Sequence, residues 1–362
     1  MADTIDTQAL SRAEQYLQSA ITGESDGLPT PRSREEQFLK NCYEACGCDG
    51  LPTPRSRKEK YLYALAEKIA QSGGGSGEAQ NTLNEYLIGT RRDITAEDLV
   101  GTRSIRNGCF AYSPIYSVII PDNIIYIDAL AFIYSRSLTS VTIGKGVVKF
   151  GNEAFKSCES LKSIDIPNNV TSIGTSVFDG CSSLASATIS NSITGISDYT
   201  FRNCTSLASI DIPDSVTGIG GGAFQNCTSL ASIDIPDSVT GISAGAFRGC
   251  TSLTTINIGN GVTLINDHVF RGCTNLEFVK IGSGIEKIYT WVFGECSKLK
   301  EVVCLATNPP RLWSYVFEGV PADCIFKVKP ASVEAYKAET NWSVRADYIV
   351  ALTDEEVARY GG

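Results

Sequence analysis

The stretch that decides the fold is AFQNCTSLASIDIPDSVTGI, residues 223–242, because close copies of it recur along most of the chain. Counted from its phenylalanine, a cysteine follows three residues later, a leucine six later, and branched aliphatics nine and eleven later. A second aliphatic pair stands at fifteen and eighteen. The phenylalanines recur every 22 to 24 residues, at 110, 132, 155, 178, 201, 224, 247, 270, 293 and 317. Self-similarity at a fixed period predicts a repeat architecture.

Each repeat predicts a short strand followed by a turn. Two aliphatics two residues apart, with small polar residues between them, favour a strand with one buried face. The Ile-Pro-Asp-Ser segment at 235–238 then turns the chain, since proline presets a turn angle and Asp and Ser bond locally. About seven inward apolar side chains contribute roughly 10–20 kcal/mol, less than the cost of ordering about 23 residues at ~1.5 kcal/mol each. One repeat cannot fold alone, so we predict a solenoid of ten ~23-residue repeats, mainly short β-strands and turns.

Composition excludes several functions before any motif is considered. The 362 residues include one histidine, His268. Histidine is the commonest metal ligand and the usual general base near neutral pH, so we predict a non-enzyme with no catalytic residue, metal or cofactor. The net charge of -9 gathers no basic stripe, so nucleic acid is not expected as a partner. No apolar stretch approaches 18 residues, so no membrane insertion is expected.

The repeat resembles the BspA-like leucine-rich repeat family. The pattern AFxxCTSLxSIDIPDSVTxI carries this resemblance, together with ATNPPRLWSYVF (306–317) and VKPASVEAYKAETNW (328–342) near the end. It spans residues ~100–350. It implies a curved solenoid used for adhesion or protein binding, without enzymatic activity, and a capping helix within PASVEAYKAETNW. Members of this family are typically exported, whereas the N-terminus here shows no apolar signal segment.

The N-terminal quarter differs from the repeats. SRAEQYL (11–17), SREEQFL (33–39) and SRKEKYL (56–62) each place glutamate three residues after serine, which is a capping box. We predict three short capped helices over 1–72 as a docking or tether region, a Gly/Ser linker at 73–77 and a helical lead-in or N-terminal cap at 78–100. The solenoid is expected over 101–317 and a C-terminal cap over 318–362. The candidate docking residues are Tyr16, Leu17, Phe38, Leu39, Tyr61 and Leu62.

The segment LPTPRSRKEKYL (51–62) is similar to tandem segments in predicted structural proteins of tailed bacteriophages, particularly those of gut bacteria. This resemblance implies a virion-associated protein that is made in the host cytoplasm and binds other virion proteins through residues 1–72. Release by lysis would remove the need for a signal peptide. The alternative is a bacterial BspA-like surface adhesin or interaction module. Whether the helices make the chain a homo-oligomer stays open.

The cysteines are interpreted as structural. Seven of them recur three residues after a phenylalanine, at Cys158, Cys181, Cys204, Cys227, Cys250, Cys273 and Cys296. Cysteine behaves as a small apolar residue and is often buried, so core filling is preferred to a metal ladder or disulfides. Cys42, Cys46 and Cys48 lack a fourth ligand nearby, and structural zinc requires four.

Two columns of side chains are candidates for a recognition surface. Asp165, Asp211 and Asp234 occupy the outward strand position, where simple solvation is the first interpretation. Two residues before the phenylalanines stand Tyr199, His268, Trp291 and Tyr315, with Trp313 nearby. Terminal repeats are atypical, so packing of the cap is one interpretation. The alternative is a patch that recognises a protein or a cell-surface glycan, since aromatic rings are frequent at such sites.

Overall fold

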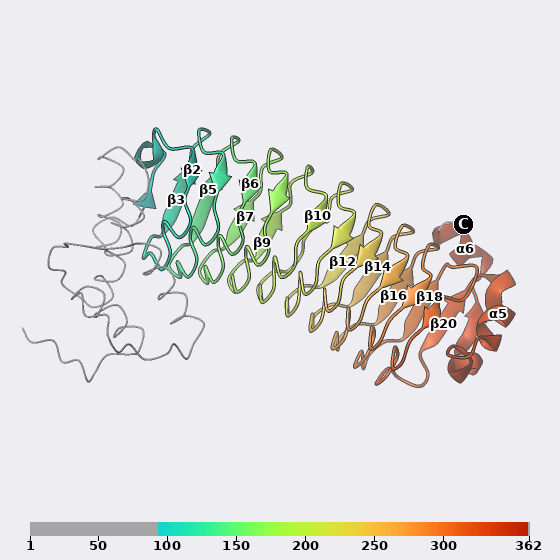
Figure 1. The fold of residues 1–362 in the computed structure, drawn as a ribbon. Coiled ribbons are helices and arrows are strands. Elements are labelled where there is room, and N and C mark those ends of the chain that lie inside the picture. The colour runs from blue at the N-terminus through green and yellow to red at the C-terminus, as the bar shows by residue number, and fades with distance from the viewer. Residues whose placement is uncertain (1–92, 361–362) are drawn as a thin grey trace, which may run out of the picture.

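The computed structural model describes residues 93–360, and they form a β-solenoid of about 11 coils (Figure 1). The predicted fold class is confirmed. The three N-terminal segments with their six candidate docking residues, the linker and Cys42, Cys46 and Cys48 lie outside the described residues. Within residues 93–360, no helix has the length and apolarity needed to cross a membrane.

Each coil but one adds a strand to a first row of parallel strands; residues 209–212 contribute only an isolated bridge between Ser186 and Ser209. This row consists of the sheets β1-β3-β5, β7-β9 and β12-β14-β16-β18-β20-β21. Its strands are β1 (Asp93–Ile94), β3 (Ser117–Ile120), β5 (Ser140–Ile143), β7 (Ser163–Asp165), β9 (Ser186–Thr188), β12 (Ser232–Ile235), β14 (Thr255–Ile258), β16 (Phe278–Ile281), β18 (Glu301–Cys304), β20 (Ile325–Val328) and β21 (Ile349–Ala351). Ile233 is aligned with Ile256, one repeat later. The in-register stacking explains why the aliphatic columns recur.

A second row of two-residue strands ends, in most coils, on the second aliphatic, eighteen residues after the phenylalanine. It comprises β2 (Ser104–Ile105), β4 (Tyr126–Ile127), β6 (Lys149–Phe150), β8 (Ser172–Ile173), β10 (Gly195–Ile196), β11 (Gly218–Ile219), β13 (Gly241–Ile242), β15 (Leu264–Ile265), β17 (Lys287–Ile288) and β19 (Arg311–Leu312). These strands are also parallel. The sequence analysis predicts only the first-row strand, because a two-residue strand is too short to show an alternating pattern.

The core contains an unbroken stack of the ten repeat phenylalanines. Neighbouring rings from Phe110 to Phe317 lie 5.0–5.7 Å apart with interplanar angles of 4–14°. The rings of Phe132 through Phe293 are at most 1% exposed. Each coil therefore buries an aromatic face against the coil before and the coil after it.

The seven repeat cysteines are buried next to this stack, and all seven are free thiols. The predicted core role is confirmed, with one addition. Each Sγ donates a hydrogen bond to the backbone carbonyl of the phenylalanine in the preceding coil, at 3.1–3.4 Å. The column therefore links coils through S–H donors as well as filling space.

Close approach between coils makes several glycines sensitive to substitution, and Gly261 is an example. A Cβ atom at Gly261 would lie 1.9 Å from the carbonyl oxygen of Asp237 in the coil before, whereas one at Gly218 would meet nothing within 4 Å. We expect Gly261→Ala to lower the free energy of unfolding by about 1–3 kcal/mol through overpacking. The matched Gly218→Ala is expected to leave it unchanged or raise it by about 0.4–1 kcal/mol. Urea unfolding of the two variants measures this; equal stabilities would contradict the close contact.

The C-terminal segment closes the solenoid with helices and two further first-row strands. After β20 come the 3-10 turn η3 (Pro330–Ser332), α5 (Val333–Ala338), η4 (Ser343–Tyr348), β21 and α6 (Asp354–Tyr360). The helix predicted within PASVEAYKAETNW is present. Tyr336 and Trp342 are at most 1% exposed and donate hydrogen bonds to the carbonyls of Ala306 and Pro310. These two rings cover the end of the phenylalanine stack.

The described part of the N-terminal segment, residues 93–100, was expected to belong to a helical lead-in or an N-terminal cap. It contains β1 and the short 3-10 helix η2 (Glu97–Leu99). Asp93 and Ile94 pair with Ser117 and Val118 of β3. The first row thus begins before residue 101, because a single strand of matching register already gains one parallel partner.

Candidate functional site

The outward aspartates lie on the exposed side of the first row. Asp165 accepts a hydrogen bond from the hydroxyl of Thr188, and the Oδ1 of Asp234 accepts one from Asn257 Nδ2 at 2.5 Å. Asp165 and Asp211 line one open cavity of about 330 Å³, which Asp234 does not reach. Ala187 lies at this cavity, in the column where the neighbouring coils have isoleucines. Its small side chain leaves space where the first row is interrupted between β9 and β12.

The residues two before each phenylalanine share an unusual backbone conformation. Tyr199, His268, Trp291 and Tyr315 have φ between 58° and 62°. The other coils share this conformation, with glycine in three of them (Gly108, Gly222 and Gly245, φ 57–65°) and Leu130, Glu153 and Ser176 in three more (φ 56–62°). Left-handed backbone is unstrained for glycine but costs roughly 1–2 kcal/mol for other residues. The conformation therefore belongs to the turn of the repeat, which adopts it with aromatic, aliphatic, acidic and small residues alike.

At the C-terminal end, these rings form two stacks on successive coils. Trp291 stacks on Tyr315 of the next coil, with centroids 5.4 Å apart, and Arg271 of the preceding coil lies 4.6 Å from the Trp291 ring centre. Trp313 stacks on Tyr289 at 4.3 Å, with Arg311 at 4.6 Å. We call these six residues the aromatic edge. Cation–π contacts of this kind orient the guanidinium groups over the ring faces.

Charge and exposure distinguish the two ends of the Trp291 stack. On one side, Arg271 forms an ion pair with Glu295 at 2.7 Å, and this pair lowers the pKa of the Glu295 carboxyl. On the other side, Tyr315 is 60% exposed. Because the coils stack in order, Arg271 and Tyr315 lie on opposite sides of Trp291. The Glu295 side chain is 52% exposed and that of Arg271 28% exposed.

The structure does not bring Tyr199 and the aromatic edge together. Gly222, Gly245 and His268 occupy the coils between them. The Tyr199 ring lies over Gly222, whose added Cβ would be 2.6 Å from Tyr199 Cε1, and Arg202 lies 4.4 Å from the ring centre. Tyr199 therefore belongs to a separate cluster of side chains.

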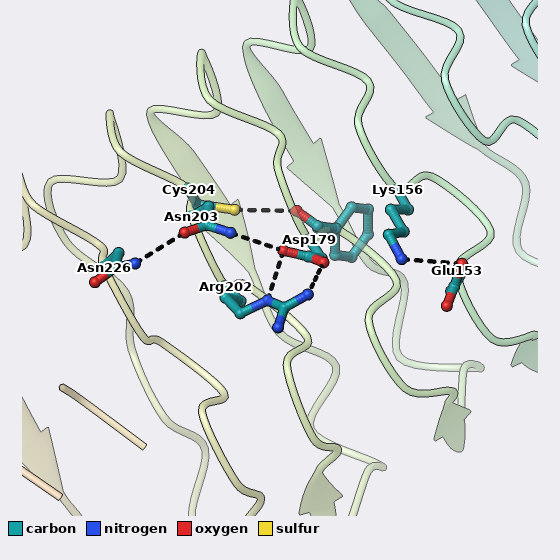
Figure 2. Close-up of polar contacts among 8 residues, drawn as sticks. Glu153, Lys156, Asp179, Arg202, Asn203, Cys204 and Asn226 are labelled. Carbon is teal, nitrogen blue, oxygen red and sulfur yellow. Dashed lines mark hydrogen bonds and ion pairs between the residues drawn. The ribbon is translucent and has the colours of Figure 1, made fainter. Parts of the chain in front are cut away.

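That cluster is a polar ladder across three coils (Figure 2). Asp179, 4% exposed, accepts two hydrogen bonds from Arg202 at 2.9 and 2.5 Å and a third from Asn203 at 3.2 Å. Asn226 continues the ladder to Asn203 at 3.0 Å. The hydrogen bond to Asp179 raises the pKa of the Arg202 guanidinium. The buried Asp179 carboxylate is satisfied by three donors from the next coil, which indicates a structural role.

His268 occupies the coil before Trp291 in the same column. Burial lowers the pKa of its imidazole, and the nearby charge of Arg271 lowers it further. Its Nδ1 atom is buried without a hydrogen-bond partner among the described residues. His268 is therefore a neutral neighbour of the aromatic edge at pH 7 rather than a charged member of it.

Three members of the aromatic edge were missed by the sequence analysis. Tyr289, Arg271 and Arg311 become evident only through their ring contacts. A weak signal was present, since Tyr289-Thr-Trp291 and Trp313-Ser-Tyr315 repeat the same aromatic spacing on consecutive coils. Over residues 93–360, no cluster of three histidine, cysteine or acidic side chains is arranged to hold a metal ion.

The fold and this surface define a class of protein, a leucine-rich β-solenoid that presents side chains along the edges of its coils. The chain belongs to the BspA type leucine rich repeat region family, whose pattern matches residues 103–231 and 194–321. Repeat proteins of this kind are commonly binding scaffolds of the surface or adhesion type, and no enzyme family is indicated.

Solved structures with similarity to the chain include leucine-rich repeat proteins from bacteria. The Treponema pallidum leucine rich repeat protein is 32% identical, covering 51% of this chain and 83% of its own, with a TM-score of 0.40. A Bacteroides ovatus leucine-rich repeat protein is 22% identical, covering 69% and 87%, with a TM-score of 0.39. Pneumococcal vaccine antigen PcpA is 17% identical, covering 70% and 85%, with a TM-score of 0.40. No protein with curated function matches the chain.

Proposed function

We propose that this protein is a non-enzymatic scaffold that binds a protein or a cell-surface glycan through the aromatic edge. The observation that carries the proposal is the stack of Arg271, Trp291 and Tyr315 on three successive coils, whose last ring is 60% exposed. Trp, Tyr and Arg are also the residues most enriched in binding hot spots.

Packing of the cap gives a weaker account of these rings. The aromatic side chains that close the solenoid are Tyr336 and Trp342, which are fully buried and hydrogen-bonded. Tyr315, in contrast, leaves 60% of its surface exposed. Burial stabilises in proportion to the apolar area removed from water, so Tyr315 contributes little to closure of the core.

Replacing Trp291 separates binding from stability. We expect both Trp291→Gly and Trp291→Ala to weaken binding at least about tenfold, as removal of a hot-spot aromatic does. Trp291→Gly should be about 1 kcal/mol more stable than Trp291→Ala, because glycine relieves the left-handed strain. Binding of the labelled full chain to intact bacterial cells and to a glycan array, with urea unfolding in parallel, measures both effects.

Tyr126 provides a matched control for this experiment. It is 47% exposed on β4, far from the aromatic edge along the solenoid. Tyr126→Ala should keep full binding, whereas Tyr315→Ala should lose it. If Trp291→Ala and Tyr315→Ala keep binding and only lower the unfolding midpoint, the rings belong to the cap and the proposal fails.

A finer proposal concerns where the scaffold works. The resemblance of LPTPRSRKEKYL to phage structural segments supports a virion-associated protein, with residues 1–72 as its anchor and the segment at 73–77 as a linker. In density-gradient fractionation of a lysate, mass spectrometry should then find the chain with intact particles, and deletion of 1–72 should release a folded solenoid. Recovery in the cell envelope, with protease access on intact cells, would instead support the alternative of a bacterial surface adhesin.

A further inference from the structure

The outer side of the first row changes its chemistry near the C-terminus. In β12 and β14, inward residues are buried and outward ones exposed. In β18, Val302 and Cys304 join the main core, while Val303 points the other way and is nevertheless fully buried. Asp234, Asn257 and Lys280 hold the position of Val303 in the preceding coils. This apolar side chain is therefore not required by the coil itself.

Val303 belongs to a small second core on this outer side. Val303, Leu305 and Leu352 are at most 3% exposed, and Phe278, Val357 and Tyr360 pack against them. The last two residues come from α6, which lies at the C-terminal end of the solenoid (Figure 1). The ring of Tyr360 stacks on Phe278 with centroids 6.4 Å apart. We call the surface under α6, formed by Phe278, Val303, Leu305 and Lys327, the outer site.

A charged contact fixes the orientation of α6 on the outer site. Lys327 Nζ contacts Glu301 at 2.9 Å and also pairs with Glu356 of α6. The other oxygen of Glu356 accepts a hydrogen bond from the backbone N–H of Thr353 at 2.9 Å, so the same carboxylate caps the helix. The hydrogen bond from Lys327 lowers the pKa of Glu356. The side chains of α6 that contact the outer site are thus the carboxylate of Glu356, the aliphatic Val357 and the aromatic Tyr360.

Fewer buried side chains attach α6 to the solenoid than attach the rest of the cap. None of its seven residues is buried. A helix of this length is not stable in water by itself, so α6 depends on the outer site for its structure. The outer site, in contrast, is built on three strands, β16, β18 and β20, that are paired in register with one another.

We propose that the outer site is a docking site for a short amphipathic helix of a partner protein, and that α6 occupies it intramolecularly. The chemistry of α6 defines the partner. Its helix carries a carboxylate for Lys327, an aliphatic residue directly after it for Val303, and an aromatic residue three positions later for Phe278. This site is separate from the aromatic edge and does not depend on the function proposed for it.

The test uses the full chain with an undocked tail and a synthetic peptide. In the variant Val357→Asp/Tyr360→Ala, α6 loses both of its apolar contacts with the outer site while the solenoid is unchanged. A fluorescent peptide spanning residues 352–360 should bind this variant. It should bind the wild-type chain at least about tenfold more weakly, because the tethered α6 competes at high effective concentration.

Matched peptides identify the contacts. Glu355 is exposed, whereas the neighbouring Glu356 contacts Lys327. The peptide with Glu356→Gln keeps capping capacity but should bind about fivefold more weakly, while Glu355→Gln should bind as the parent does. Val357→Asp in the peptide should abolish binding.

Three results would overturn the proposal. The first is a peptide that fails to bind an undocked variant with wild-type unfolding behaviour. The second is a large loss of solenoid stability in the undocked variant, which would make α6 a structural part of the cap. The third is a wild-type dimer that the peptide dissociates, since the occupant would then be α6 of a second copy.

Discussion

Raising the pH above about 8.5 is expected to unfold the solenoid steeply. Burial raises the pKa of the repeat thiols, to about 12 for Cys227 and well above the usual value for Cys158, Cys204 and Cys250. In the unfolded chain a thiol ionises near pH ~8.5. Above that pH the unfolded state binds fewer protons than the folded state, so the free energy of unfolding falls as pH rises.

The number of thiols makes this effect large. Each buried thiol lowers the free energy of unfolding by about 1.4 kcal/mol for every pH unit above its pKa in the unfolded chain. The seven repeat cysteines together give a slope of about 10 kcal/mol per pH unit, comparable with the ~5–15 kcal/mol by which folded domains are stable. The stability from the thiols is fully present below pH ~8.5 and is lost between there and the folded pKa values. Urea titrations at half-unit pH steps from 7.5 to 10.5 measure the slope.

Removing two thiols separates their contribution to the pH dependence of the free energy of unfolding from other effects of alkaline pH. Cys204→Ala/Cys227→Ala should lower the slope by about 2.7 kcal/mol per pH unit, as expected for two fewer ionising groups. The Ala variant should be less stable at pH 7, because it loses two buried sulfurs and their hydrogen bonds to Phe178 and Phe201. An unchanged slope would show that thiolates form inside the folded solenoid.

Removing one ring from the middle of the phenylalanine stack should lower the free energy of unfolding by about 3–5 kcal/mol. Phe224 is fully buried, with Phe201 at 5.4 Å on one side and Phe247 at 5.1 Å on the other. Phe224→Ala removes the ring and leaves a cavity, which accounts for that magnitude. Because each coil contacts only its neighbours, the loss should divide the solenoid into two separately unfolding halves. Hydrogen exchange should accelerate first in residues 218–242.

Phe224→Leu is the control for the stack. Leucine is also apolar but has no ring, so we expect a smaller loss of about 1–1.5 kcal/mol. A single cooperative transition in Phe224→Ala, with exchange uniform from end to end, would contradict the nearest-neighbour account. Equal losses for Ala and Leu would show that ring stacking, rather than the cavity, dominates.

The structural features that could be predicted from the sequence are those that recur from coil to coil. The spacing of Phe224, Cys227 and Ile233 predicts the period, the buried positions and the first-row strand, and all three are confirmed. The polarity of Asp234 at the intervening position predicts its exposure. These features depend on local pattern and burial, which one sequence carries.

Contacts between coils were harder to predict. The left-handed backbone of Trp291 depends on a turn shape that a tryptophan does not signal, since glycine marks it in other coils. The pairing of Tyr289 with Trp313 joins residues 24 positions apart, and the S–H hydrogen bonds join residues 26 apart. The role of Val303 depends on α6, which departs from the repeat altogether.

The near-identity of successive coils has a consequence for how this protein can vary. Residues 204–219 and 227–242 are the same sixteen residues, CTSLASIDIPDSVTGI. An inserted coil would find its Phe, Cys and Ile partners already in register on both sides. The distance between the first coil and the aromatic edge would change by one strand spacing, about 4.8 Å, while both ends kept their structure. The solenoid is in this sense an adjustable spacer, whose length can evolve independently of what it presents.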